Sequence, residues 1–156
     1  MYLFPLFLPV ISWICTGLFG KALGKNGVIL LNISCMILTF LSTVFIFLEV
    51  CIYKYSCVVA LGSWIRCGLF DISFEFLFDS ITATMLLVVS FISLLVHLYS
   101  IDYMKTDPHF IRFLTYLTLF TFFMFILLTA GSLLQFFAGW EGVWLASYLL
   151  INFWFT

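Results

Sequence analysis

Long apolar runs, each about as long as the hydrocarbon layer of a membrane is thick, dominate this sequence of 156 residues. A helix needs about 20 predominantly apolar residues to cross ~30 Å of hydrocarbon, because it rises about 1.5 Å per residue. Charged residues divide the chain into five such runs, so the sequence predicts an all-α integral membrane protein in which residues 1–156 form one membrane domain. The predicted transmembrane helices are residues 3–19, 28–53, 80–103, 113–130 and 133–155.

The composition excludes a soluble domain. Apolar residues make up 65% of the chain and charged residues 8%, whereas soluble domains carry roughly 25% charged residues. So few charges could not cover a water-exposed surface of this size. The net charge of -1 provides no basic face for nucleic acid, so lipid is the expected surrounding and nucleic acid is excluded as a partner.

The longest connection, residues 54–79, separates the second and third apolar runs. Strand-like character at 58–61 and 71–76 predicts a small extramembrane hairpin there. Cys57 and Cys67 share this connection, and whether they are bridged or free stays open. No pair of cysteines has metal-ligand spacing, and two histidines do not make a zinc or haem site.

The basic residues predict an orientation, because positively charged loops stay on the cytoplasmic or matrix side of a membrane. The first and third loops carry more of them than the other side, which has Lys54 and Arg66. These inner-side residues are Lys21, Lys25, Lys105 and Arg112. The N-terminus is therefore expected to face outward and the C-terminus inward.

Glu141 lies about nine residues into the fifth run, near the expected middle of the bilayer. An ionisable group at this depth is costly and by default marks an ion or proton path. The alternative is a structural carboxyl group that is hydrogen-bonded to a neighbouring helix. Trp144 and Tyr148 follow at helical spacing and carry hydrogens that could bond to the carboxylate.

Three small residues recur every four positions beside Glu141, namely Ala138, Gly142 and Ala146. Such a ridge lets a second helix approach closely. We expect this ridge to pack against another helix, one that these five helices need not supply, and we expect Glu141 to be buried beside it.

Polar residues in the third run fall on one side of the predicted helix. They are Asp79, Thr82, Ser90, Ser93, His97 and Ser100. Such a stripe either lines a hydrated path or bonds to neighbouring helices. His97 favours the first interpretation, because the ordinary pKa of its side chain, about 6.5, suits proton exchange. Glu49, near the end of the second run, is expected to reach the surface or pair with Lys54, and we assign it no function.

Several motifs resemble the chain 5 family of mitochondrial NADH–ubiquinone oxidoreductases (respiratory complex I). The most specific is Gly139-Trp140-Glu141-Gly142-Val143, continued by Leu145-Ala146-Ser147-Tyr148-Leu149-Leu150-Ile151. Others are Phe76-Leu77-Phe78-Asp79-Ser80, Val96-His97-Leu98-Tyr99-Ser100-Ile101, Asp107-Pro108-His109 and Thr121-Phe122-Phe123-Met124. These motifs follow the family's order along the whole chain.

The resemblance implies an antiporter-like subunit of the membrane arm, with Glu141 as the proton-relay carboxylate and His97 in a possible proton path. Asp79, Ser90, Ser93, Trp144 and Tyr148 would support them. FMN, iron–sulfur clusters and ubiquinone would be held elsewhere in the complex, and this chain would carry no cofactor. The expected location is the mitochondrial inner membrane. A separate chain would carry the remainder of the subunit, including a lysine helix, and the other membrane-arm subunits and lipids are the further expected partners.

One residue departs from the family pattern, and two rival functions stay open. The family usually has glycine where this sequence has Trp144, which implies a shifted neighbouring helix or altered water access to Glu141. A subunit of a multisubunit sodium/proton antiporter has a similar fold, but its motif usually places Phe-Trp before the glutamate. A structural scaffold that has lost transport is the second rival.

Overall fold

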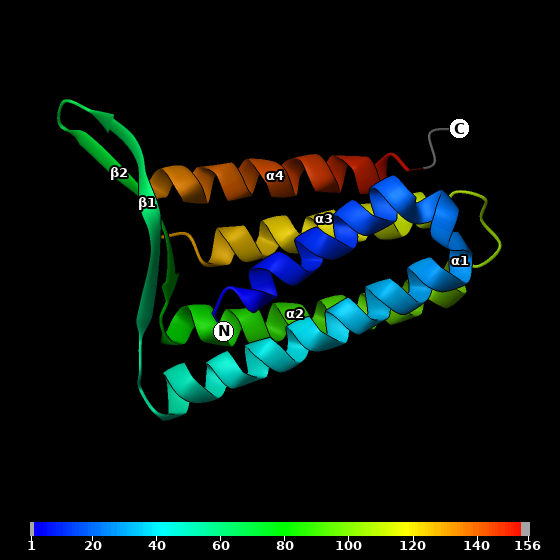
Figure 1. The fold of residues 1–156 in the computed structure, drawn as a ribbon, viewed down its shortest axis with the longest axis horizontal. Coiled ribbons are helices and arrows are strands. Elements are labelled where there is room, and N and C mark those ends of the chain that lie inside the picture. Colours follow the sequence, from blue (N-terminus) through cyan, green and yellow to red (C-terminus); the bar gives the residue numbers. More distant parts are fainter. Residues whose placement is uncertain (1, 154–156) are drawn as a thin grey trace.

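The computed structural model describes residues 2–153 as a bundle of helices with a β-hairpin across one end (Figure 1). The elements in chain order are α1 (Phe4–Phe47), a π-helical turn η1 (Leu48–Ile52), β1 (Cys57–Cys67), β2 (Phe70–Phe78), α2 (Ser80–Tyr103), α3 (Phe110–Leu128) and α4 (Leu133–Ile151). The end of the bundle that carries the hairpin is called the hairpin end. The opposite end, with residues 20–27 and 104–109, is called the turn end.

Helix α1 is bent at Gly24 into two antiparallel halves (Figure 1). Gly24 has φ 74° and ψ 174°, a backbone conformation that only glycine adopts without strain. In a straight helix Ser12 and Asn32 would be roughly 30 Å apart at 1.5 Å per residue. The Ser12 hydroxyl instead donates a hydrogen bond of 3.2 Å to Asn32 Oδ1, so the two halves lie side by side.

Five separate transmembrane helices are not confirmed by the described residues. Three helices are long and apolar enough to cross a membrane: Phe4–Ile52, Ser80–Tyr103 and Phe110–Leu128. The first two predicted spans are the two halves of one bent helix, because only Gly24 leaves the helical conformation where a loop was expected. The third predicted span has the bounds of α2, and the fourth begins three residues late and ends two residues late relative to α3.

The fifth predicted span corresponds to α4 but is not among the three apolar helices. Gln135 and Glu141 lower the hydropathy of this helix. It ends at Ile151, and residues 154 and 155 of the predicted span lie outside the described part of the chain.

The predicted hairpin is confirmed and is longer than expected. β1 and β2 pair antiparallel from Cys57–Phe78 to Cys67–Phe70, with irregularities between Ala60 and Gly62 and between Ser63 and Ile65. Cys57 and Cys67 are both free. They stand at opposite ends of one strand, roughly 30 Å apart at about 3.3 Å per residue, so this geometry excludes a bridge between them.

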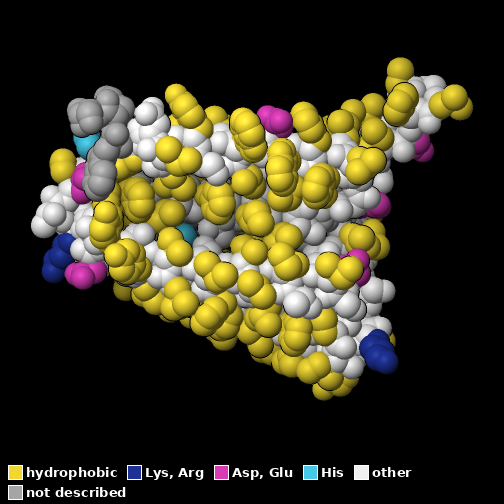
Figure 2. All heavy atoms as spheres, turned by 180° about the vertical axis from the view of Figure 1, so that it is seen from behind, with side chains coloured by type: hydrophobic (Ala, Val, Ile, Leu, Met, Phe, Trp, Pro, Cys, Tyr) yellow, Lys and Arg dark blue, Asp and Glu magenta, His cyan; other side chains and the backbone are white. Residues whose placement is uncertain are grey.

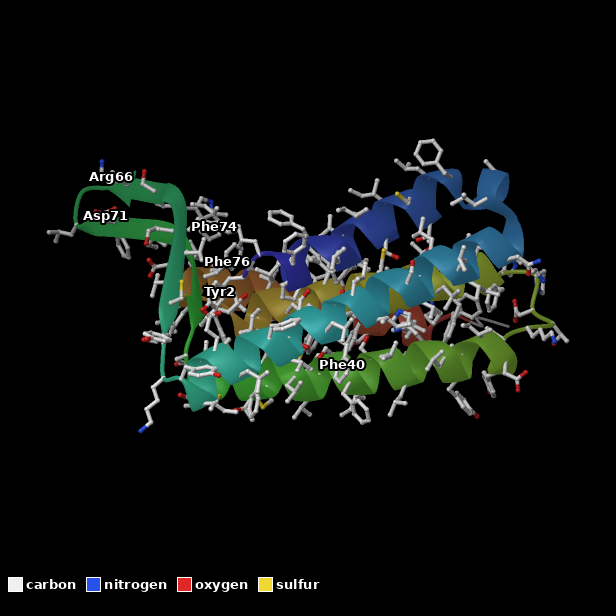
Figure 3. All side chains as sticks on the ribbon, turned by 60° about the horizontal axis from the view of Figure 1, so that its bottom comes forward. Tyr2, Phe40, Arg66, Asp71, Phe74 and Phe76 are labelled. Carbon is white, nitrogen blue, oxygen red and sulfur yellow. The ribbon has the colours of Figure 1, made fainter. Side chains whose placement is uncertain are left out.

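Strand β2 also anchors the hairpin to the bundle through the connection between α3 and α4. The Leu77 amide donates to the Thr129 carbonyl at 2.9 Å, and the Gly131 amide donates to the Glu75 carbonyl at 3.2 Å. Phe74 and Phe76 lie near Tyr2 at the base of the hairpin, whereas the Arg66–Asp71 ion pair (3.4 Å) lies near its exposed tip (Figure 3).

The bundle holds two apolar clusters, one near each end. Near the hairpin end, the buried cluster includes Ile46, Phe78, Leu86 and Phe125, and near the turn end a second cluster surrounds Val28, Met104 and Leu114. Figure 2 shows that apolar side chains also cover the middle of the outer surface, while charged side chains gather mainly at the two ends. This is the surface that a bilayer solvates, because lipid tails cover apolar side chains without cost.

Candidate functional site

Helix α4 docks on α3 through a face of small residues. Gly139, Gly142 and Ala146 are buried there. A Cβ atom at Gly139 would lie 2.8 Å from the Leu127 amide nitrogen, and one at Gly142 would meet the Phe123 ring. The predicted close helix approach is therefore confirmed. Its partner is α3, so one of the predicted helices of this chain supplies the approach whose source the sequence left open.

The composition of this face differs from the predicted ridge by one residue. Ala138 is exposed and Gly139 takes its place against α3. The spacing of three and four residues that follows a helix face explains the shift, because strict four-residue spacing drifts around a helix of 3.6 residues per turn.

Glu141 lies on the outward face of α4 and is exposed in this chain. The expected burial is therefore not found among α1–α4, since the glycine face, and not the Glu141 face, contacts α3. Within residues 2–153 its carboxylate has no hydrogen bond or ion pair.

Trp144 and Tyr148 share this outward side with exposed fractions of 68% and 63%. Neither donates a hydrogen bond to Glu141 within the described residues. Trp144 is exposed, so within the described residues its indole requires no shift of a neighbouring helix, and an effect on water access to Glu141 stays a prediction. Trp144 and Tyr148 line an open groove of about 480 Å³, together with Val143, Ser147 and other side chains of α4.

The polar stripe of α2 points into the bundle, as its spacing predicts. Thr82, Ser90, His97 and Ser100 are buried. Asp79 has a different task, because its carboxylate accepts a 2.8 Å hydrogen bond from the Thr82 amide and caps the first turn of α2. The Ser90 and Thr43 hydroxyls lie 2.7 Å apart and join α2 to the second half of α1.

His97 has an exposed fraction of 1% and lies between α2 and α3. Its Nδ1 is 2.7 Å from the Ser93 carbonyl oxygen. A carbonyl can only accept, so Nδ1 carries the hydrogen in the neutral ring and Nε2 keeps its lone pair. Nε2 faces the Thr118 hydroxyl at 3.5 Å. The Ser93 hydroxyl in turn lies 2.7 Å from that of Thr121, so α2 and α3 are bonded on both sides of the ring.

Asn32 is a buried amide that the sequence analysis missed. Its Oδ1 accepts from Ser12 at 3.2 Å and from Thr118 at 2.9 Å. Its Nδ2 is buried and has no acceptor among the described residues. The sequence does carry a signal for it. An amide lies in the middle of one apolar run, and hydroxyl residues are spaced three or four positions apart in two other runs.

The buried side chains of Ser12, Asn32, His97 and Thr118 are together called the polar centre. Two cavities flank it. At the turn end, a pocket of about 520 Å³ is lined by Thr16, Lys21, His109, Arg112 and Thr115, among others. On the other side of His97, an apolar groove of about 250 Å³ runs between α2 and α3. The polar centre is thus enclosed by helices but lies close to the turn-end surface.

Glu49 is placed differently from the expectation. It lies in the π-helical turn η1, and its Oε2 is buried without a hydrogen-bond partner among the described residues. Lys54 is exposed and forms no ion pair with it within residues 2–153. Burial, together with a hydrogen bond to Glu49, raises the pKa of Tyr2 to about 12, so this phenol stays protonated at the hairpin end.

Comparison with known proteins gives consistent results. A family model described as NADH-ubiquinone oxidoreductase (complex I), chain 5 N-terminus, matches residues 64–114. NADH-ubiquinone oxidoreductase chain 5 of Acanthamoeba castellanii is 54% identical over all 156 residues, that of Chondrus crispus 50% and that of Triticum aestivum 49%. In each case the match covers 100% of this chain and 23% of the relative.

A solved structure shares the fold. The structure of the membrane-bound sulfane sulfur reductase, an archaeal respiratory membrane complex, contains a chain that superposes with a TM-score of 0.79 at 18% identity. The superposition covers 92% of this chain and 28% of that chain. This similarity concerns the fold alone.

The bent first helix, the hairpin and the α3–α4 pair make up an α-helical membrane-protein fold, and 92% of this chain superposes on the archaeal chain. Within that class, the chain is a homologue of the N-terminal part of NADH–ubiquinone oxidoreductase chain 5, and it spans about a quarter of the length of these relatives.

Proposed function

We propose that this chain forms the N-terminal part of a proton-translocating, antiporter-like subunit of respiratory complex I. The observation that carries the proposal is the 54% identity to a chain 5 protein along all 156 residues. The structure supports it with an apolar exterior around a buried polar centre. Oxidation of NADH and reduction of ubiquinone take place in other subunits, and FMN and iron–sulfur clusters belong to those subunits too.

In this proposal the chain crosses the mitochondrial inner membrane five times, with the two halves of α1 as separate crossings. The turn end faces the matrix. Lys21, Lys25, Lys105 and Arg112 lie at this end, and the Lys25 ammonium reaches the Lys105 carbonyl oxygen at 3.5 Å, which places the first and third loops together. The N-terminus then faces the intermembrane space, together with the hairpin.

Glu141 acts as a proton-relay carboxylate, with His97 on a proton path beside Ser93. The outward face of α4 is covered by helices that residues 2–153 do not contain, in a subunit that adjoins other membrane-arm subunits. Those helices supply a cation near Glu141. A lone carboxylate facing lipid would be costly, and its exposed setting here is the feature that favours a covering partner.

The test is the substitution Glu141→Gln in the assembled complex, because glutamine keeps the shape of the side chain and removes its titratable proton. We expect NADH oxidation to fall and fewer protons to be translocated per NADH. The matched control is Glu141→Asp, which keeps a titratable carboxyl group at the same position of α4 and should retain more translocation than Glu141→Gln. Unchanged translocation in a fully assembled Glu141→Gln complex would leave a scaffold as the function of this chain.

A further inference from the structure

We propose that the polar side chains shared by α1, α2 and α3 form a one-sided hydrated route, which leads protons from the turn end of the bundle to Nε2 of His97. The route deepens the proposed function, since it describes how protons reach the interior of a proton-translocating subunit. It starts at the turn-end pocket, passes Asn32 and ends at His97.

The turn-end pocket is the mouth of the route. Lys21, His109 and Arg112 stand at its rim, and Thr16 and Thr115 lie deeper in it. The charged rim keeps the pocket in contact with water. Thr115 donates a 3.4 Å hydrogen bond to the Thr16 hydroxyl, so the pocket continues inward along hydroxyl groups of α1 and α3.

Asn32 is the middle of the route. Its carbonyl oxygen joins Ser12 to Thr118, and both hydroxyls lie one helical turn further in than the hydroxyls of Thr16 and Thr115. A buried amide nitrogen without an acceptor is the kind of group that ordered water satisfies in proteins. Nδ2 of Asn32 is such a group among the described residues, so we place a bound water there.

His97 is the end of the route. Its Nδ1 hydrogen is committed to the Ser93 carbonyl, and the lone pair of Nε2 faces Thr118. A hydronium proton that arrives along the water chain adds to Nε2, where an N–H bond forms and an O–H bond breaks. The hydronium becomes water and the ring becomes an imidazolium that still donates to Ser93. No other reactant is needed.

The route is closed toward the hairpin end. Beyond His97, the Thr43–Ser90 pair is followed by the apolar cluster of Ile46, Phe78, Leu86 and Phe125, all with exposed fractions of 0%. This cluster offers no hydrogen bond to a water molecule. Water that reaches His97 from the turn end therefore cannot continue to the opposite surface along these helices.

Accessibility of introduced cysteines tests the route directly. Thr115→Cys, Thr118→Cys and Thr43→Cys make the same chemical change at the mouth, in the middle and beyond the end. Each is made in the assembled complex after the five native cysteines are replaced by serine or alanine. A small, membrane-impermeant cationic methanethiosulfonate is added to each side of the membrane in turn.

We expect Thr115→Cys and Thr118→Cys to react from the side that the turn end faces, about tenfold or more faster than Thr43→Cys. A thiol in water forms the reactive thiolate, and one pKa unit of elevation in an apolar site removes nine-tenths of it. If Thr118→Cys reacts no faster than Thr43→Cys in a complex that translocates protons normally, the route is overturned and the proposed function stands.

Asn32→Leu provides a second measurement that does not depend on labelling. It removes the water-binding amide at similar volume, and Thr43→Val is its control, because it breaks a buried hydroxyl pair off the route. We expect Asn32→Leu to lower the protons translocated per NADH and Thr43→Val to leave this ratio unchanged. If Asn32→Leu and Thr43→Val both keep the ratio of the unsubstituted complex while Glu141→Gln lowers it, protons take another path. If all three variants keep that ratio, the proposed function is overturned as well.

Discussion

Asp79 and Glu141 are two carboxylates in different surroundings. Asp79 lies at the start of α2, whereas Glu141 lies in the middle of α4. Asp79 is held by a backbone amide at the first turn of α2, which it caps. Glu141 has no hydrogen-bond partner within residues 2–153 and lies on an exposed face. A carboxylate whose bonds are already used for capping is poorly suited to pass protons, so the structure favours Glu141 over Asp79 as a relay.

This difference can be tested at Asp79. Asparagine caps a helix about as well as aspartate, whereas alanine cannot, so Asp79→Ala should lower the free energy of unfolding by about 1 kcal/mol and Asp79→Asn should hardly change it. Asp79→Asn also removes the titratable proton. We therefore expect normal proton translocation in that variant, measured together with thermal unfolding of the purified complex. Lowered translocation at unchanged stability would instead make Asp79 part of the proton path.

At the scale of the elements, the contact between α3 and α4 depends on glycine. Gly139→Ala would place a methyl group 2.8 Å from the Leu127 backbone nitrogen, and backbone cannot move aside as a side chain can. We expect a loss of about 1–3 kcal/mol in the free energy of unfolding, typical of overpacking. Denaturant titration of the helical signal in detergent measures it.

The control for Gly139→Ala is its neighbour Ala138, which is exposed on the other side of the helix. Ala138→Val should change the free energy of unfolding by less than about 0.5 kcal/mol, the usual range for surface substitutions. A loss in Ala138→Val equal to that in Gly139→Ala would mean that α4 turns its predicted ridge, and not its glycine face, toward a partner.

Several elements follow from the sequence because one physical rule determines them. The stretch from Ser80 to Tyr103 is bounded by a capping aspartate and by a polar turn, so its helix could be predicted to the residue. The inward direction of its polar stripe follows from the cost of hydroxyls and imidazole in lipid. The hairpin follows from alternating residues around Gly62 and Gly68.

Other features depend on tertiary contacts and could not be predicted from single residues. Lys21 and Lys25 indicated a loop, yet the helix continues on both sides of Gly24, because one residue in a left-handed conformation reverses the chain. The surroundings of Asn32 could not be predicted either, because they depend on Thr118, which α3 places beside it. The sequence predicted a buried Glu141, but its side of α4 is exposed within residues 2–153, because the glycine face contacts α3 instead.

At the scale of the whole molecule, the two ends differ in charge and in shape, and the orientation can be tested with a natural residue. Cys67 is exposed in the hairpin, which the proposal places in the intermembrane space. A membrane-impermeant maleimide added to mitoplasts should label Cys67 without disruption of the membrane, since the outer face is open to the reagent. The measurement is mass spectrometry of the labelled peptide.

Cys67→Ser is the control for this experiment, because the remaining cysteines lie in helices or at the base of the hairpin. Labelling that is lost in Cys67→Ser confirms the site of reaction. Labelling of Cys67 only in inside-out vesicles would reverse the proposed orientation and place the hairpin in the matrix.

The bend at Gly24 also has a consequence for how the chain enters a membrane during synthesis. Asn32 would have to cross the hydrocarbon with its amide unsatisfied if the second half of α1 were inserted alone, at a cost of several kcal/mol. The hydrogen bond from Ser12 forms as soon as the two halves lie together. Antiparallel halves also oppose their helix dipoles. Insertion of α1 as one preformed helical pair therefore costs less free energy than insertion of its halves in succession. Gly24 permits this pair to form before the rest of the bundle is present.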